Sequence, residues 1–187
     1  MKYQALRKKY NGYASWGIWD PNDINITPSD DVNGKNPKYV FVGLNASKAK
    51  DGRIWGNFHF RHRGGHDGNL RSAIMGTKFE GAYLTDILKY PDEPIGAKVD
   101  AYFKEHPGEL KKHFDMFSDE LDLLGDVETI FVFGKIAQKY VDRFMKENPK
   151  YSEIRVVKLT HYSASSMYAK GAYRNYLSDV AKREGLI

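Results

Sequence analysis

The amino-acid sequence predicts one α/β domain in which helices cover both faces of a parallel β-sheet. Four short runs are rich in apolar and β-branched residues, as buried strands are, and segments with helical periodicity separate them. Strands that alternate with helices form right-handed crossovers and therefore a parallel sheet. The length of 187 residues fits one domain with a sizeable core. We assign residues 1–37, an N-terminal helix and a polar loop, to the same domain.

Four runs carry the strand pattern. Residues 38–44 and 127–133 are almost continuously apolar, which is typical of strands covered on both faces. Runs at residues 81–87 and 154–160 complete the set, and the third run leads into Gly134. Ligands of open α/β sheets bind at the carboxyl ends of the strands, so the residues that follow each run are the candidates for function.

Helical periodicity fills the segments between and after these strands. Asp67 is expected to cap a short helix. Pro107 suits the first position of a longer helix, and Gly125 is expected to end it. Two further helices are expected at residues 134–146 and 170–183.

The composition is that of a basic globular protein without cysteine. The formal net charge is +5, which favours polyanionic partners such as nucleic acid. The lack of cysteine excludes disulfides, thiolate catalysis and zinc–thiolate sites, and it suits a cytoplasmic protein. No apolar run approaches the roughly 20 residues of a membrane-spanning helix, and no apolar stretch follows the basic N-terminus as in a secretory signal. We therefore expect no membrane as a partner.

The first strand leads into the turn Gly43-Leu44-Asn45, which Ala46-Ser47 follow. A glycine lets the backbone turn sharply, and Asn45 then presents an amide over the edge of the sheet. Such a side chain can hold an attacking water, but it cannot act as a strong base because the amide does not titrate. The alternative is that Asn45 only caps the turn.

The fourth strand leads into His161, which is followed by a serine-rich turn at residues 162–166. A histidine at this position can donate a hydrogen bond to negative charge that develops on a leaving group. Hydroxyls and backbone amides of a small-residue turn can also hold a phosphate. A serine-rich turn with an ordinary histidine is the alternative.

Residues 55–67 place aromatic side chains among arginines and histidines. This composition suits the stacking of a base beside a phosphate chain. The spacing of His59, His62 and His66 could suggest a metal site. However, glycines interrupt any helix that would align them, and no carboxylate at ligand spacing joins them. We therefore expect a loop of mixed charge and no metal.

Asp86 lies near the end of the second strand. A carboxylate there could recognise donor groups of a ligand or serve as a base, or it could simply accept backbone amides at the strand end. The sequence contains no phosphate-binding or dinucleotide-binding glycine motif and no Gly-x-Ser-x-Gly nucleophile turn. No cofactor is expected.

Taken together, these motifs resemble those of the uracil-DNA glycosylase superfamily, in particular its mismatch-specific branch for uracil and thymine. The turn at residues 43–47 is similar to that branch's Gly-Ile-Asn-Pro-Gly turn. The turn that begins at His161 is similar to the superfamily's His-Pro-Ser-Pro turn, and the Gly134-Lys135 turn also matches. The resemblance covers roughly residues 38–180. It implies a three-layer α/β/α fold around four parallel strands in the order 2-1-3-4.

The resemblance also implies a reaction with assigned roles. A target base would be flipped from DNA into a pocket, where Asn45 positions the attacking water and His161 stabilises the departing base anion. Phe58 resembles the aromatic residue on which the base stacks. Gly43 and Leu44 are counted among the substrate-binding residues.

The remaining implied contacts are with the base edge and the DNA backbone. Asp86 lies near the position where uracil-specific members place an asparagine that reads the base edge. Ser163 and Ser165 would bind phosphates. Met167 or Tyr168 would fill the space that the flipped base leaves in the stack.

The sequence departs from the family pattern at three places. Ala46-Ser47 replace Pro-Gly, and Tyr162 replaces the first proline of the histidine turn, so both loops differ in stiffness. Asp86 changes the chemistry more, because an ionised carboxylate only accepts hydrogen bonds. It suits N3–H of uracil but repels O4. The sequence therefore predicts that uracil fits poorly and that a base edge with two adjacent donors fits better.

The predicted function is that of a DNA glycosylase that cleaves the N-glycosidic bond of a flipped damaged or mismatched base without a metal. DNA is the expected partner, and a monomer is the expected state. One alternative is a catalytically inactive protein of the same fold that binds nucleic acid or a nucleotide. Another is a nucleoside or nucleotide hydrolase on a flavodoxin-like sheet.

Overall fold

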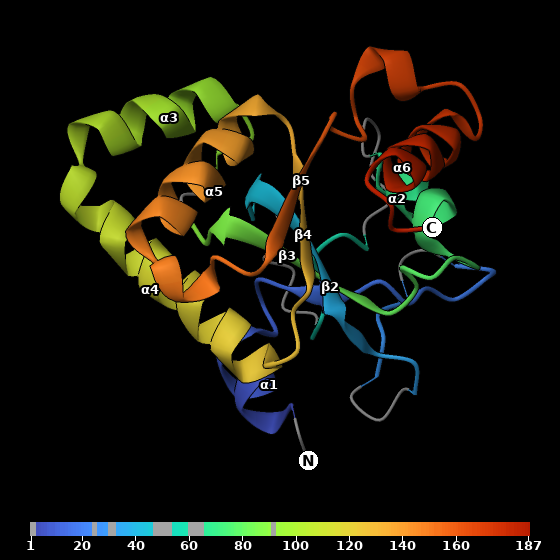
Figure 1. Cartoon of the computed structure of the whole chain (residues 1–187), viewed down its shortest axis with the longest axis horizontal. Helices are drawn as coiled ribbons and strands as arrows, with labels where there is room; N and C mark the ends of the chain where they lie inside the picture. The colour runs from blue at the N-terminus through green and yellow to red at the C-terminus, as the bar shows by residue number, and fades with distance from the viewer. Residues whose placement is uncertain (1–2, 24–25, 30–32, 47–53, 60–65, 91–92) are drawn as a thin grey trace.

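A computed structural model describes residues 3–23, 26–29, 33–46, 54–59, 66–90 and 93–187. Within these ranges a mixed β-sheet of five strands lies between two layers of helices (Figure 1). The α/β class that the sequence predicts is therefore confirmed.

Four of the strands run parallel to one another and coincide with the four apolar runs. They are β2 (Asn36–Asn45), β3 (Ala82–Leu88), β4 (Thr129–Phe133) and β5 (Arg155–Leu159). Strand β2 pairs with β3 and β4, and β4 pairs with β5. In the register of β2 with β3, Gly43 lies opposite Asp86 and Asn45 lies opposite Leu88. The register thus places the Gly43-Leu44-Asn45 segment and Asp86 side by side at the carboxyl ends of β2 and β3.

The sheet differs from the predicted one by a fifth, antiparallel strand, whereas the four parallel strands lie in the predicted order 2-1-3-4 when they are counted along the chain. A fifth strand, β1 (Ser15–Trp16), is present, and the strand order is β1-β3-β2-β4-β5. Strand β1 pairs antiparallel with β3, so that Trp16 lies opposite Tyr83 with 5.2 Å between the ring centroids. A strand of two residues is too short to show a pattern in the sequence. Burial of Trp16 against the edge of the sheet explains this pairing instead.

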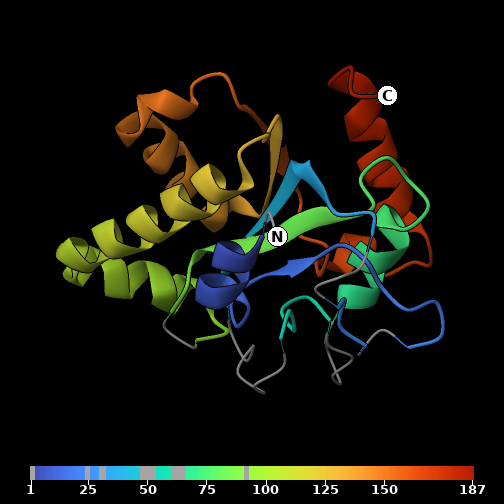
Figure 2. The same cartoon turned by 90° about the horizontal axis from the view of Figure 1, so that it is seen from below.

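Alternate residues along the strands point into two separate hydrophobic layers. On one face, Val40 and Val132 belong to a cluster with four helices, which are α1 (Gln4–Tyr10), α3 (Gly96–Glu105), α4 (Pro107–Leu124) and α5 (Lys135–Glu147). On the other face, Phe41 and Phe131 stack with 4.6 Å between ring centroids. Helices α2 (Asp67–Ile74) and α6 (Ala172–Arg183) cover that face (Figures 1 and 2).

The four helices expected from periodicity are present as α2, α4, α5 and α6, whereas α3 was not predicted. Pro107 is the first residue of α4, and Gly125 ends it with a positive φ of 81°. The predicted cap at Asp67 is wrong, because His66 occupies the N-cap position and Asp67 is the first helical residue. Two short 3-10 helices, η1 (Pro149–Tyr151) and η2 (Ser165–Met167), flank β5. No helix within the described ranges is long and apolar enough to span a bilayer.

Candidate functional site at the carboxyl edge of the sheet

The candidate site lies where β2, β3, β4 and β5 end. Gly43 and Asp86 are paired on β2 and β3, and His161 follows β5. Gly134, which follows β4 with a φ of 76°, lies beside His161, since a β-carbon there would be 3.6 Å from the His161 β-carbon. Two glycines at strand ends thus lie beside the two candidate polar side chains: Gly43 lies beside Asp86, and Gly134 lies beside His161.

A glycine is needed at position 43 because two side chains approach its backbone closely, and not because the chain turns there. Its backbone is extended, as part of β2, and it is not among the residues with positive φ. A β-carbon at this position would lie 2.2 Å from Oδ1 of Asp86 and 3.5 Å from the ring of Phe58. The expectation that this glycine makes a sharp turn is therefore wrong. Its absent side chain instead lets Asp86 and Phe58 approach the backbone of β2.

Asp86 is a buried acid with an altered affinity for its proton. Its side chain is only 4% exposed, and Oδ2 accepts a hydrogen bond of 2.8 Å from Nδ2 of Asn57. Burial raises the pKa of Asp86 to about 7, although the bond from Asn57 and the charge of Lys89 act in the opposite direction. The group can therefore gain or lose a proton near neutral pH. The partner of its side chain is an asparagine and not the backbone amides considered for a strand-end aspartate.

Asn57 and Phe58 approach Asp86 from the segment before α2. The Asn57 side chain also donates to the carbonyl oxygen of Tyr13 and accepts from the backbone N–H of Phe58. Phe58 has a φ of 65°, a left-handed conformation that is rare for residues with a β-carbon, and its ring is buried. The structure thus places Phe58 near Gly43, with the ring packed in the core, and its role in stacking a base stays a prediction.

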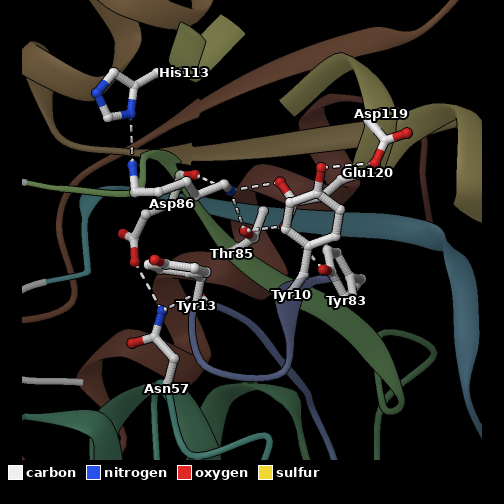
Figure 3. A network of polar contacts seen from close by, with 10 residues as sticks. Tyr10, Tyr13, Asn57, Tyr83, Thr85, Asp86, His113, Asp119 and Glu120 are labelled. Atoms are coloured by element: carbon white, nitrogen blue, oxygen red, sulfur yellow. Dashed lines mark hydrogen bonds and ion pairs between the residues drawn. The ribbon is translucent and has the colours of Figure 1, made fainter. Parts of the chain in front are cut away.

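A network of buried polar groups lies beneath the end of β3 (Figure 3). Nζ of Lys89 forms an ion pair with Glu120 and also donates to Oγ1 of Thr85 and to the main-chain oxygen of Asp86. Both side chains of the ion pair are fully buried. Tyr83 donates a second hydrogen bond to the Glu120 carboxylate. The network fixes the main chain at Asp86 from the opposite side of β3.

His161 is held as a neutral imidazole. Its Nδ1 accepts a hydrogen bond of 3.2 Å from the backbone N–H of Ser163 and lies 2.8 Å from the Ser163 hydroxyl. Burial, with a smaller effect of the charge on His66, lowers the pKa of His161 to about 4. Because Nδ1 is an acceptor, the hydrogen of the neutral ring lies on Nε2. The ring can therefore donate one hydrogen bond to a ligand.

Asn45 and Leu44 make contacts with the segment that follows β3 and with α3. Nδ2 of Asn45 donates a hydrogen bond of 2.9 Å to the main-chain oxygen of Glu93. The Leu44 side chain faces Gly96, where a β-carbon would be 3.0 Å from it. Asn45 thus fastens a neighbouring segment to the sheet edge, while Leu44 packs toward the helical layer on one face.

The turn after His161 carries the other residues implied by the resemblance. The side chains of Ser165 and Tyr168 are exposed, and Tyr168 stacks on His66 with 4.5 Å between ring centroids. Met167 is partly buried and packs against the core that includes α6. Nδ2 of Asn69 donates to the main-chain oxygens of Tyr162 and Met167, so α2 holds this turn in place.

The histidines of residues 55–67 do not form a metal cluster within the described part of the chain, where no three candidate ligand side chains converge. Nε2 of His59 lies 3.1 Å from the main-chain oxygen of Trp16, and its ring lies beside that of Trp19. His62 lies outside the described residues, as does Ser47. His59 is thus a packed residue of the core.

The structure gathers the predicted residues into two groups. Asp86 and Phe58 both approach Gly43, and Asn45 lies two residues after Gly43 on β2. His161 lies after the end of β5, two strands away from β2. Sequence reasoning missed Asn57, Lys89 and Glu120. Of these, Glu120 gave a signal, because it falls three residues after Phe117 on the apolar face of α4.

The fold and this edge define an α/β protein with a buried acid and a neutral histidine at the ends of parallel strands. A family model described as the uracil DNA glycosylase superfamily matches residues 30–182. The chain therefore belongs to the uracil-DNA glycosylase superfamily, whose members bind DNA. A search of curated proteins found no significant match to the chain. Membership of the mismatch-specific branch stays a prediction.

Proposed function

We propose that this protein is a DNA glycosylase that hydrolyses the N-glycosidic bond of a base extruded from DNA. The observation that carries the proposal is His161, a neutral imidazole whose Nδ1 accepts a hydrogen bond and whose Nε2 therefore carries the hydrogen. A donor of this kind suits a base that departs as an anion. Superfamily membership supports the same class of reaction.

In the proposed reaction, the oxygen of a water molecule bonds to C1′ of the nucleotide as the bond from C1′ to the base nitrogen breaks. The bonding electrons leave with the base, which departs as an anion. The proton that the water loses once it is bonded to the sugar passes to this anion, directly or through solvent, and yields the neutral free base. Asn45 orients the water, because an amide can bind it without exchanging a proton. The products are an abasic site and the free base.

His161 acts in this scheme as a hydrogen-bond donor and not as an acid. With a pKa of about 4, the ring is neutral at physiological pH and has no extra proton to transfer. Its Nε2–H can still stabilise negative charge on the departing base. Removal of a donor of this type from other active sites lowers the rate by about two to three orders of magnitude.

The turn after His161 is the proposed DNA contact. Ser165 and Tyr168 are exposed on it, and the formal net charge of +5 favours a polyanion. Ser165 suits a phosphate, and Met167 or Tyr168 suits the stack that a flipped base leaves. Ser163 is assigned a different role from the one implied by the resemblance, because it binds His161.

The test measures abasic-site formation on labelled single- and double-stranded oligonucleotides that carry one uracil, hypoxanthine, xanthine or alkylated base. The wild-type protein should form product from at least one of them. Asn45→Ala and His161→Ala should each lower the single-turnover rate by about two orders of magnitude or more. Lys111→Ala, an exposed site on α4, is the control and should not change the rate. The absence of product from every substrate would refute the proposal.

A second candidate is a DNA-binding protein of the same fold without catalysis. It is favoured by the hydrogen bond from Asn45 to Glu93, which already engages the amide that would orient water. Such a protein would bind DNA with an affinity that falls steeply as salt rises, yet would yield no abasic sites. A small-molecule hydrolase would also yield no abasic sites, but it would lack this salt-dependent affinity for DNA.

A further inference from the structure

Helix α6 holds the main chain at the point where β5 leads into His161. Thr160 follows Leu159, the last paired residue of β5, and directly precedes His161. The backbone N–H of Thr160 donates a hydrogen bond of 2.8 Å to the hydroxyl of Tyr176, and its main-chain oxygen accepts one of 2.9 Å from the hydroxyl of Tyr173. Both polar groups of this residue's backbone are thus bonded to side chains of one helix.

The two tyrosines act together because of their spacing on α6. They are three residues apart, so they lie on one face of the helix, and their ring centroids are 5.6 Å apart. Tyr173 is only 1% exposed, and Tyr176 is partly buried against the same core. A ring that is packed in a core moves little, so its hydroxyl fixes the backbone atom to which it bonds. The pair therefore fixes Thr160 although this residue lies beyond the sheet.

A row of aromatic rings connects Tyr173 to the imidazole by a second route. The Tyr173 ring packs edge-on against Tyr162 with 6.2 Å between centroids, and the Tyr162 ring stacks on that of His161 at 4.5 Å. Phe133 of β4 lies edge-on to the rings of both Tyr162 and His161. Aromatic pairs at these distances attract each other and favour defined angles. The orientation of the imidazole thus depends on α6 through the main chain and through side chains.

We propose that Tyr173 and Tyr176 are positioning residues that set the direction of the Nε2–H bond of His161. A hydrogen bond weakens steeply when its angle closes, so the imidazole stabilises a departing base only if this bond points at the atom that gains the charge. A displacement of Thr160 would turn the ring that follows it. The inference rests on the proposed function, since it takes His161 as the donor to the departing base.

The test compares Tyr173→Phe, Tyr176→Phe and the double variant, in which only hydroxyls are removed. Single-turnover rates and DNA affinities are measured on the oligonucleotide that the wild-type protein cleaves fastest. Tyr173→Phe should lower the rate about tenfold and the double variant further, because a misplacement of about 1 Å can cost a hundredfold. Tyr176→Phe should have a smaller effect, since water can replace a partly buried hydroxyl. The affinity for DNA should stay within about twofold of the wild-type value, because the change acts on the reaction step.

Tyr151→Phe is the matched control. Tyr151 is a buried tyrosine that precedes β5, and its hydroxyl donates to the main-chain oxygen of Ser118 at 2.8 Å. It therefore loses the same kind of bond at the end of β5 opposite to His161. Urea unfolding should show a loss of stability in both Tyr151→Phe and Tyr173→Phe, whereas only Tyr173→Phe should lower the rate.

Two further measurements separate positioning from a general loss of structure. In a His161→Ala background, Tyr173→Phe should not lower the remaining rate further, because it acts through the imidazole. Nitrogen-15 NMR of the free protein provides a readout that needs no reaction. The ring signals of His161 should shift or broaden in Tyr173→Phe and should stay unchanged in Tyr151→Phe.

The inference would be overturned by an unchanged rate in the double variant, or by a loss in Tyr173→Phe that persists in the His161→Ala background. An equal loss of rate in Tyr151→Phe would also overturn it. If Tyr173→Phe does not fold, Tyr176→Phe decides the question by the same comparisons. Failure of the proposed function looks different, because the wild-type protein then yields no abasic site from any oligonucleotide. In that case the His161 signals decide: a shift in Tyr173→Phe supports the positioning role, and unchanged signals refute it.

Discussion

Nδ2 of Asn57 and Oδ2 of Asp86 lie 2.8 Å apart, and this hydrogen bond joins the segment before α2 to the end of β3. The same segment carries Phe58, whose left-handed backbone conformation is unfavourable for a residue with a side chain. The amide of Asn57 bonds to the backbone of Phe58 as well as to Asp86. One side chain therefore links the conformation of the aromatic residue to the chemistry of the buried acid.

Asn57→Ala should raise the pKa of Asp86 above its wild-type value of about 7, because the lost hydrogen bond favours the carboxylate. It should also lower the free energy of unfolding by about 1–3 kcal/mol, since Oδ2 is left buried without a donor. Carboxyl carbon NMR and urea unfolding measure the two effects. Asn22→Ala, in an exposed turn, is the control. An unchanged pKa in Asn57→Ala would contradict this account.

The raised pKa of Asp86 predicts that the contribution of this residue to the free energy of unfolding falls as pH rises. The folded state holds the proton up to about pH 7, whereas the unfolded chain releases it near the ordinary pKa of 3.8. The contribution is therefore fully present below about pH 4 and is lost as pH rises through 7, by about 1.4 kcal/mol for each pH unit of that window. Asp86→Asn should lack this slope. Urea unfolding at pH 5 and pH 8 makes the comparison, and equal slopes in both proteins would refute the prediction.

Gly43→Ala should destabilise the site, because the added β-carbon would lie 2.2 Å from Oδ1 of Asp86. The carboxyl group must move, which weakens its bond to Asn57 and should cost about 1–3 kcal/mol of stability. The free energy of unfolding and the titration of Asp86 should both change. Gly108→Ala, in an open position of α4, should leave stability unchanged or raise it slightly. The same effect in both variants would show that the clash at Gly43 is relieved elsewhere.

Much of the fold could be predicted from local patterns. The runs that became β2 and β4 are continuously apolar because both faces of these strands are buried, and Pro107 and Gly125 mark the ends of α4. Strand β1 could not be predicted, because its two residues pair with β3 only through the packing of Trp16. Helix α3 buries only Val99 and Phe103 fully, so its periodic signal is weak.

The site was predicted less completely, because its main contacts join segments that are distant in the sequence. Asn57 and Asp86 come from different elements, and nothing in either local sequence reports their hydrogen bond. Gly43 was recognised, but its role is set by a neighbouring strand and not by its own φ. Ser163 was expected to bind a phosphate, although it binds the ring of His161 two residues earlier.

The lowered pKa of His161 predicts that the ring stays neutral throughout pH 5–8. In the unfolded chain it would take up a proton near pH 6.5, so its contribution to stability is present above that pH and is lost as pH falls toward 4. Nitrogen-15 NMR should find hydrogen on Nε2 and none on Nδ1. Ser163→Ala removes the hydroxyl but keeps the backbone N–H that donates to Nδ1, so the hydrogen should stay on Nε2. The rate of this variant should therefore fall less than that of His161→Ala. Titration of His161 near pH 6.5 would contradict the neutral-donor role.

The buried ion pair of Lys89 and Glu120 provides a further test of how the end of β3 is held. Lys89→Met leaves the Glu120 carboxylate buried without its cation, and it removes the donor to the main-chain oxygen of Asp86. The single variant should therefore lose about 3–5 kcal/mol of stability. It should also raise the pKa of Asp86, since the charge of Lys89 lowers it.

Replacing both charges, as Lys89→Met with Glu120→Leu, should recover part of this loss, because neither charge is left buried alone. Recovery should be incomplete, since Tyr83 and Thr85 lose the carboxylate that accepts their hydroxyls. Lys150→Met breaks an exposed ion pair and should cost less than about 1 kcal/mol. Urea unfolding of all three variants measures the differences. Equal losses of stability in the single and double variants would contradict this account. They would mean that the hydrogen bonds from Tyr83 and Thr85, and not the balance of charge, hold the end of β3 in place.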